Sequence, residues 1–202
     1  MVTLYTISAP SGAGKTTLVN ALIETTDNIK VSISHTTRQP RQGEKNGENY
    51  HFVTKDEFME MLENNLFLEQ AQVFDNHYGT SQQWLKEQLN AGIDVILEID
   101  WQGAEKIRRL KPDTVNIFIL PPSRAVLEQR LHDRGKDSEE VIAKRLRGAV
   151  EEMRHCVEYD YIVINDDLDQ ALKDLQSIIQ SQRLRQVVQA AKLEGLLKEL
   201  LN

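Results

Sequence analysis

Ser8-Ala9-Pro10-Ser11-Gly12-Ala13-Gly14-Lys15-Thr16-Thr17 is the stretch of sequence that decides the fold. It follows an apolar run, Leu4 to Ile7, that predicts a short buried strand, and it leads into Lys15 to Glu24, whose apolar spacing predicts a helix. Small residues between a strand and a helix let the backbone wrap around an anion, with its N–H groups pointing inward. The helix adds the positive end of its dipole. We therefore expect this loop to bind the phosphates of a nucleoside triphosphate.

The order of residues in the loop matches the P-loop pattern with one departure. Lys15 supplies a mobile cation for the β- and γ-phosphates, and the Thr16 hydroxyl is suited to ligate Mg²⁺. The first glycine of the pattern is Ala9 here, and alanine adopts a positive φ only at a cost. The loop residues predicted to bind ATP are Ala9, Pro10, Ser11, Gly12, Ala13, Gly14, Lys15, Thr16 and Thr17.

Outward from the loop, predicted strands and helices alternate along the chain. Further strands are expected at Lys30–Ser34, Asp94–Asp100, Val115–Leu120 and Tyr161–Ile164. Further helices are expected at Gln82–Asn90, Gly103–Leu110, Ser123–His132, from residue 139 to about His155, and from about Leu168 onward. This alternation predicts an α/β fold with a three-layer core and a parallel sheet. The resemblance described below implies that this is a P-loop kinase core.

The predicted central strand from Asp94 to Asp100 ends in acids. Glu98 and Asp100 face the same side of this strand because side chains alternate with period two. In P-loop enzymes an acid at the end of a central strand holds Mg²⁺ or its waters. We expect Asp100 to do so through a water molecule.

Residues 34–81 lack this alternation and are expected to form a lobe inserted into a core of residues 1–33 and 82–202, within one domain. Short elements are predicted there, a strand around His51 to Val53, a helix from Asp56 to Glu63 and an extended segment from Leu66 to Phe74. A charged break from Arg134 to Glu139 predicts a lid at about residues 130–147.

Composition and charge exclude several classes of protein. The net charge of −7 argues against nonspecific nucleic-acid binding. No apolar run is long enough for a membrane-spanning helix, and no signal peptide is evident. The single cysteine, Cys156, and the absence of a leader favour a cytoplasmic protein. The five histidines show no metal-ligand spacing.

The C-terminal leucines follow a helical period. Leu193, Leu196, Leu197, Leu200 and Leu201 make one apolar face. This face is expected either to pack on the core, the favoured alternative, or to form a contact between subunits of a homo-oligomer.

A longer set of motifs carries a resemblance to a known family. Its parts are the segment Ser34-His35-Thr36-Thr37-Arg38-Gln39-Pro40-Arg41-Gln42-Gly43-Glu44, then Gly47 and Tyr50, then Glu69, the run Tyr78-Gly79-Thr80, and Asp100-Trp101-Gln102-Gly103. In this order they resemble the GMP-binding side of guanylate kinases, and the resemblance spans nearly the whole chain. It implies ATP and GMP as substrates and transfer of the γ-phosphoryl group of Mg·ATP to GMP, giving ADP and GDP.

The resemblance also implies roles for the acceptor-side residues. Two arginines and two tyrosines would bind the GMP phosphate by charge-assisted hydrogen bonds, namely Arg38, Arg41, Tyr50 and Tyr78. Glu69 would accept from the two adjacent donors of guanine, while the Ser34 and Thr80 hydroxyls donate to its carbonyl. Glu98 and Asp100 complete the predicted GMP site, although the family has Asp where this chain has Glu98.

On the donor side, the resemblance assigns the lid and one loop. Asn165 would lie beside the adenine of ATP, although its sequence also suits a helix N-cap. The predicted catalytic residues are Lys15, Arg38, Arg130, Arg134 and Arg145. No general base is needed, because the GMP phosphate, with a second pKa of about 6, is already mostly ionised at neutral pH.

Two alternatives remain at this point. Guanylate-kinase-like domains of scaffold proteins bind peptides without catalysis, and other nucleoside monophosphate kinases act on a different base. The presence of Lys15 and the lid arginines disfavours the first, and Glu69 with Ser34 and Thr80 disfavours the second.

Overall fold

The computed structural model describes residues 2–73, 75–133 and 139–202, and within these ranges five parallel strands form a central sheet. The strand order is β2-β7-β1-β8-β9, with bounds β1 (Leu4–Ser8), β2 (Ile29–Val31), β7 (Asp94–Glu98), β8 (Val115–Leu120) and β9 (Tyr161–Ile164). The central strands are buried on both faces, as their continuous apolar runs require. The predicted parallel α/β core is confirmed.

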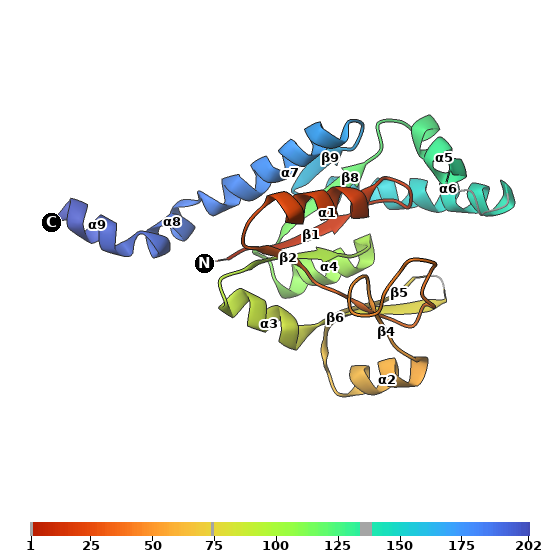
Figure 1. Cartoon of the computed structure of the whole chain (residues 1–202), viewed down its shortest axis with the longest axis horizontal. Helices are drawn as coiled ribbons and strands as arrows, with labels where there is room; N and C mark the ends of the chain where they lie inside the picture. The colour runs from red at the N-terminus through yellow and green to blue at the C-terminus, as the bar shows by residue number, and fades with distance from the viewer. Residues whose placement is uncertain (1, 74, 134–138) are drawn as a thin grey trace.

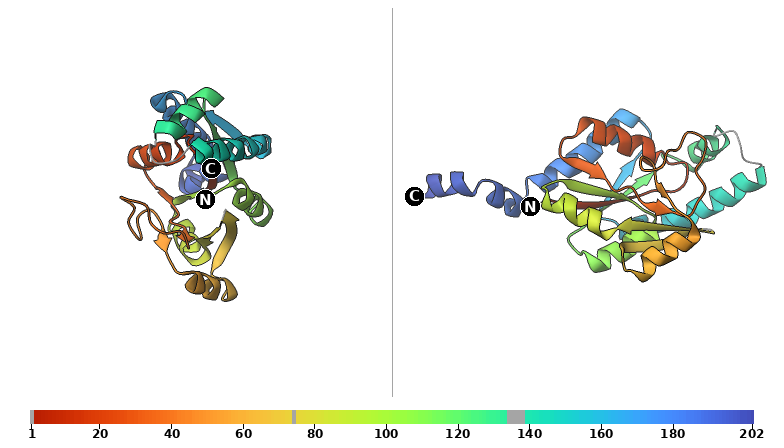
Figure 2. Two further views of the ribbon diagram at one scale, coloured as in Figure 1. Left: turned by 90° about the vertical axis from the view of Figure 1, so that its right-hand side faces the viewer. Right: turned by 60° about the horizontal axis from the view of Figure 1, so that its bottom comes forward.

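Helices cover both faces of this sheet (Figures 1 and 2). The helices α1 (Lys15–Thr25) and α7 (Leu168–Arg183) pack on one face, where Ile7 and Ile96 meet Leu18. The helices α3 (Gln82–Asn90) and α4 (Trp101–Leu110) pack on the other, against Val95 and Leu97. Alternate residues of β7 thus point into the two different core layers, which gives the three-layer arrangement that was predicted.

A second sheet lies within the predicted inserted lobe. Its strand order is β4-β3-β6-β5, with bounds β3 (His35–Thr36), β4 (His51–Phe52), β5 (Phe67–Val73) and β6 (Asn76–Ser81). The helix α2 (Lys55–Glu63) precedes β5 and begins with a capping box between Thr54 and Glu57. All of this sheet comes from residues 35–81, and the domain boundaries at 33–34 and 81–82 stay a prediction.

The sequence did not predict strand β6. Its residues, Asn-His-Tyr-Gly-Thr-Ser, show no apolar alternation and include two poor strand formers. Antiparallel pairing with β5, in which Ala71 lies opposite Tyr78, holds the segment extended.

The helices α5 (Arg124–Asp133) and α6 (Glu139–Arg154) pack against each other at one end of the core. Leu127 and Leu131 of α5 contact Ile142 and Leu146 of α6 in a small apolar cluster. The 3₁₀ helix η1 (His155–Glu158) continues α6. The predicted lid falls in this region, and its residues 134–138 lie outside the described residues.

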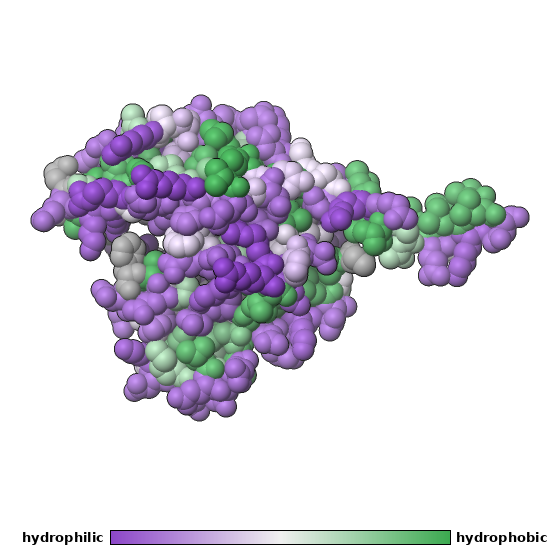
Figure 3. Space-filling view, turned by 180° about the vertical axis from the view of Figure 1, so that it is seen from behind, coloured by the Kyte–Doolittle hydropathy of each residue, from purple (hydrophilic) through white to green (hydrophobic). Residues whose placement is uncertain are grey.

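The C-terminal helices α8 (Gln186–Lys192) and α9 (Glu194–Leu201) extend away from the body of the molecule (Figures 1 and 2). Both lie wholly within the described residues, and neither contains a buried residue. Figure 3 shows apolar side chains along one side of this extension, where Leu200 and Leu201 are strongly exposed. The expectation that this apolar face packs on the core is therefore wrong, because the chain leads away from the core after α7. Across the described ranges, no helix has the length and apolar character needed to cross a membrane.

We expect deletion of residues 186–202 to change the free energy of unfolding by less than about 1 kcal/mol, since no core contact is lost. The anchor of α7 remains in this truncation, because Arg183 binds Asp94 at 2.9 Å and donates to the carbonyl of Asp27 at 2.7 Å. Thermal unfolding of the two proteins measures the difference.

A truncation that also removes Arg183 is the control, and it should be clearly less stable because buried Asp94 loses its cation. A large loss of stability in the shorter deletion would show that α8 and α9 support the core. Sedimentation of the same proteins tests the subunit contact, which stays a prediction.

Candidate active site

The loop between β1 and α1 has the backbone that a phosphate cradle needs. Gly12 and Gly14 have φ values of 95° and 87°, in the region that favours glycine. A Cβ at Gly14 would lie 2.4 Å from the side-chain nitrogen of Asn165. Among the described non-glycine residues, only Asn28 and Asn65 have positive φ, so Ala9 does not need the conformation that alanine avoids. The departure at Ala9 therefore costs the loop nothing in backbone strain.

Asn165 supports this loop from the side. The side-chain nitrogen Nδ2 of Asn165 donates to the backbone carbonyl of Ala13 at 2.7 Å. The backbone carbonyl of Asn165 accepts from Nη1 of Arg130 at 3.0 Å. The N-cap of α7 is Asp167, which accepts from the backbone of Gln170, so Asn165 does not cap that helix. Its predicted place beside adenine stays a prediction.

Lys15 forms an ion pair with Glu98, at 2.6 Å between Nζ and Oε2. The two side chains are largely shielded from solvent, with 22% and 18% of each exposed. Glu98 stands at the end of β7, beside the phosphate loop on β1. The longer side chain at this position therefore engages the P-loop lysine directly, and its predicted contact with GMP is untested.

Two adjoining cavities lie along the loop and the inserted lobe. The larger, about 810 Å³, is lined by the phosphate loop, Thr16, Arg38 and Arg41. The smaller, about 260 Å³, is lined by Glu69, Tyr78 and Asp100. The residues that line both cavities are Ala9, Ser11, Lys15, Ser34, Tyr50 and Glu98. The two spaces therefore meet at Lys15, and residues of both the phosphate loop and the lobe line each of them.

The far end of the smaller cavity holds a buried carboxyl group. Glu69 is only 6% exposed and accepts a hydrogen bond of 2.7 Å from the Thr80 hydroxyl. Burial raises the pKa of Glu69 to about 7, against the opposing effect of the Thr80 hydrogen bond. One carboxyl edge with a positioned hydroxyl beside it suits the donor and acceptor groups of a guanine base.

At the mouth of the larger cavity, Arg38 lies among aromatic rings of the lobe. Its guanidinium carbon is 5.2 Å from the ring centre of Tyr50, and the Tyr50 and Tyr78 rings are 6.0 Å apart. Burial raises the pKa of the Tyr50 hydroxyl, which keeps it protonated as a donor. Arg41 lines the same cavity. The four residues predicted to bind a phosphate are thus gathered at one place.

The lid arginines are not gathered there. In the described part of the chain, Arg130 and Arg145 do not line either cavity, and Arg134 lies outside the described residues. Arg130 instead reaches the Asn165 carbonyl behind the phosphate loop. Their catalytic role stays a prediction.

Glu152 lines the smaller cavity and was not predicted from the sequence. Burial and the nearby Asp100 charge raise its pKa to about 7, while the Ser11 backbone N–H acts to lower it. Within the helical stretch around it, this acid looks like an ordinary surface charge. Its spacing of seven residues from Arg145 was the available signal, since it places both on one face of α6.

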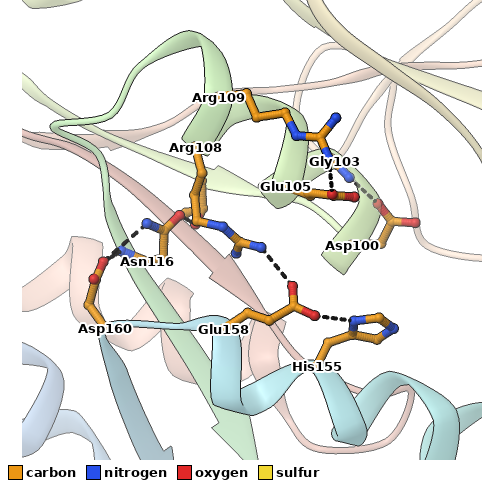
Figure 4. A network of polar contacts seen from close by, with 10 residues as sticks. Asp100, Gly103, Glu105, Arg108, Arg109, Asn116, His155, Glu158 and Asp160 are labelled. Carbon is orange, nitrogen blue, oxygen red and sulfur yellow. Dashed lines mark hydrogen bonds and ion pairs between the residues drawn. The ribbon is translucent and has the colours of Figure 1, made fainter.

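Figure 4 shows how α4, which begins at this site, is joined to η1, the short helix that follows α6. Asp100 caps α4 by accepting from the Gly103 backbone at 2.9 Å. Two turns along, Arg108 binds Glu158 of η1 at 2.7 Å, and Glu158 also contacts His155 at 2.7 Å. The His155 ring stacks on Trp101 with 3.7 Å between centroids. These contacts join η1 to the helix that Asp100 caps, and Trp101 packs against His155 there.

The parallel sheet, the glycine-rich loop with its lysine and the adjoining double cavity define a P-loop nucleotide kinase. The family model described as guanylate kinase matches residues 1–182. Guanylate kinases of Saccharophagus degradans, Pseudomonas fluorescens and Escherichia coli are 56%, 58% and 54% identical to the chain. These matches cover 98–99% of the chain and 97–98% of each relative. The crystal structure of guanylate kinase from Anaplasma phagocytophilum superposes with a TM-score of 0.79 at 33% identity, covering 96% of this chain and 94% of the other. The chain belongs to the guanylate kinase family.

Proposed function

We propose that the residues described above carry out in-line transfer of the γ-phosphoryl group of ATP to GMP, giving ADP and GDP. As a member of the guanylate kinase family, the enzyme phosphorylates GMP with ATP. The observation that carries the assignment of residues is the pair of adjoining cavities that meet at Lys15. The larger contains most of the phosphate loop together with Arg38 and Arg41, and the smaller contains Glu69, so the phosphates of the two nucleotides would meet beside Lys15.

Base selection would depend on Glu69 and Thr80. When ionised, the Glu69 carboxylate accepts from the two adjacent donors on the guanine edge. Ser34 donates to the guanine carbonyl, and the Thr80 hydroxyl, which donates to Glu69 in this structure, turns to the same carbonyl when the base binds. Adenine lacks the donor pair and would leave a buried carboxylate unpaired, which is strongly unfavourable.

The transfer step would rest on positioning and charge. Lys15 leaves Glu98 to contact the β- and γ-phosphates of ATP, while Arg38, Arg41, Tyr50 and Tyr78 hold the GMP phosphate in line. The attacking oxygen is already mostly ionised, so no side chain needs to remove a proton. Arg130, Arg134 and Arg145 would reach the phosphates on closure of the lid, which also excludes water from the site.

The oxygen donors at the site fit Mg²⁺ brought in by ATP. Thr16 lines the larger cavity and would supply a hydroxyl ligand, and Asp100 would act through a water. In the described ranges, no group of three or more His, Cys, Asp or Glu side chains could hold a metal ion by itself. Bound with the nucleotide, Mg²⁺ would neutralise charge on the phosphate oxygens.

An acceptor panel tests this function. Purified enzyme with Mg·ATP should release ADP with GMP, and should release at least about 100-fold less with AMP, UMP, dTMP or no acceptor. Release with another monophosphate at the rate seen with GMP would overturn the base assignment. A folded protein that releases no ADP would instead point to a binding module of the scaffold kind.

A further inference from the structure

Glu44 in the inserted lobe makes three hydrogen bonds to the two arginines of the predicted phosphate site. Its Oε2 and Oε1 accept from Nη1 and Nη2 of Arg38 at 3.0 and 2.9 Å. Its Oε2 also accepts from the backbone N–H of Arg41 at 2.7 Å. The Arg38 and Glu44 side chains are only 14% and 20% exposed. This carboxylate is therefore part of a well-ordered, shielded arrangement.

The hydrogen bonds use one particular edge of the Arg38 guanidinium. A guanidinium offers two edges that can bind an oxyanion with two parallel bonds, Nη1 with Nη2 and Nε with Nη2. Glu44 takes the first edge, and the remaining hydrogen of Nη1 goes to the carbonyl of Gln39 at 2.8 Å. The Nε edge is thus the one left to face a second anion.

The rest of the pocket agrees with this orientation. The guanidinium carbon of Arg38 lies 5.2 and 5.8 Å from the ring centres of Tyr50 and Phe52. These rings hold the guanidinium in addition to its hydrogen bonds with Glu44. Although burial acts to lower it, the Glu44 hydrogen bond raises the pKa of Arg38, and contact with Tyr78 adds to this effect. Arg38 is therefore held by Glu44, by the two rings and by a hydrogen bond with Tyr78, a residue predicted to bind the same phosphate.

We propose that Glu44 is a positioning residue for the GMP phosphate. Its carboxylate holds the Nη1–Nη2 edge of Arg38 and the Arg41 backbone, so that the Nε edge of Arg38 and the Arg41 side chain receive the phosphate without rearrangement. Glu44 stays in place when GMP binds and does not compete with it. The inference rests on the proposed GMP site and adds to it a residue that acts through the two arginines.

The test compares GMP with guanosine, which lacks the phosphate. In the Glu44→Gln variant, GMP should bind at least about tenfold more weakly, because an amide cannot pair with both Arg38 nitrogens as an acceptor. Guanosine affinity and the KM for ATP should stay within about twofold of the wild type. Glu105→Gln, which removes an exposed partner of Arg109 on α4, is the matched control and should change neither affinity.

Each other outcome overturns the proposal. Unchanged or tighter GMP binding in Glu44→Gln would mean that the carboxylate is idle or occupies the place of the phosphate. Equal weakening of GMP and guanosine would mean that Glu44 only supports the fold of the lobe. If wild-type protein binds GMP no better than guanosine, the proposed phosphate site itself is wrong, and this failure is distinguishable from the others.

Discussion

Replacement of Lys15 by methionine should lower kcat about 100- to 1,000-fold, as expected when a group that stabilises transition-state charge is removed. Lys15 stands where the two cavities meet, and its Nζ forms an ion pair of 2.6 Å with Glu98 Oε2. Methionine keeps most of the volume of the side chain and removes its charge. Steady-state ADP release with saturating Mg·ATP and GMP measures the change.

The same substitution leaves Glu98 without its cation, and this could lower stability and mimic a loss of catalysis. The double variant Lys15→Met/Glu98→Gln removes both charges and separates the two effects. We expect it to unfold close to the wild-type Tm and to remain inactive. A folded Lys15→Met variant with wild-type kcat would contradict the role of Lys15.

The core could be predicted from the sequence because its signals are local. The runs Val115–Leu120 and Tyr161–Ile164 are apolar, bounded by polar segments and long enough for one buried strand, and the structure gives both the predicted bounds. Gly12 and Gly14 lie at the positions where the loop needs positive φ. Each of these elements is specified by its own residues.

The parts that were missed depend on distant partners. Strand β6 is extended because β5 pairs with it, and nothing in its own composition indicates a strand. The leucines of α9 have a helical period, but the period alone does not say what covers them, and here they face away from the core. Strand β6 therefore depends on its pairing with β5, and the exposure of the α9 leucines depends on the direction that the chain takes after α7.

The site residues also divide into those that local sequence predicts and those that depend on distant parts of the chain. Lys15 and the phosphate loop follow from strand–loop–helix physics, whereas Glu69 was assigned only through the family resemblance. Its hydrogen bond to Thr80 joins two strands that pair in the folded lobe, and no spacing rule indicates it. Glu152 lines the cavity from α6, and apart from its spacing from Arg145 nothing in the neighbouring sequence indicates this.

The affinity for guanosine should fall about tenfold for each pH unit below about 7, because only ionised Glu69 can accept from both guanine donors. Burial raises the pKa of Glu69 from 4.5 to about 7, so the carboxyl is largely protonated at pH 6 and largely ionised at pH 8. Guanosine is the right ligand because it has no phosphate of its own to titrate in this range. Binding measured from pH 5.5 to 8 without ATP or Mg²⁺ gives the profile.

The Glu69→Gln variant identifies the titrating group. An amide cannot accept both guanine donors at any pH, so binding should be at least about 100-fold weaker at pH 8 and almost independent of pH. The free protein should show the opposite dependence. Native Glu69 holds its proton between pH 4.5 and about 7 while the unfolded chain has released it, so this group lowers stability as pH rises through that window. Guanosine affinity that stays constant between pH 6 and 8 in the wild type would show that Glu69 is ionised throughout or does not contact the base.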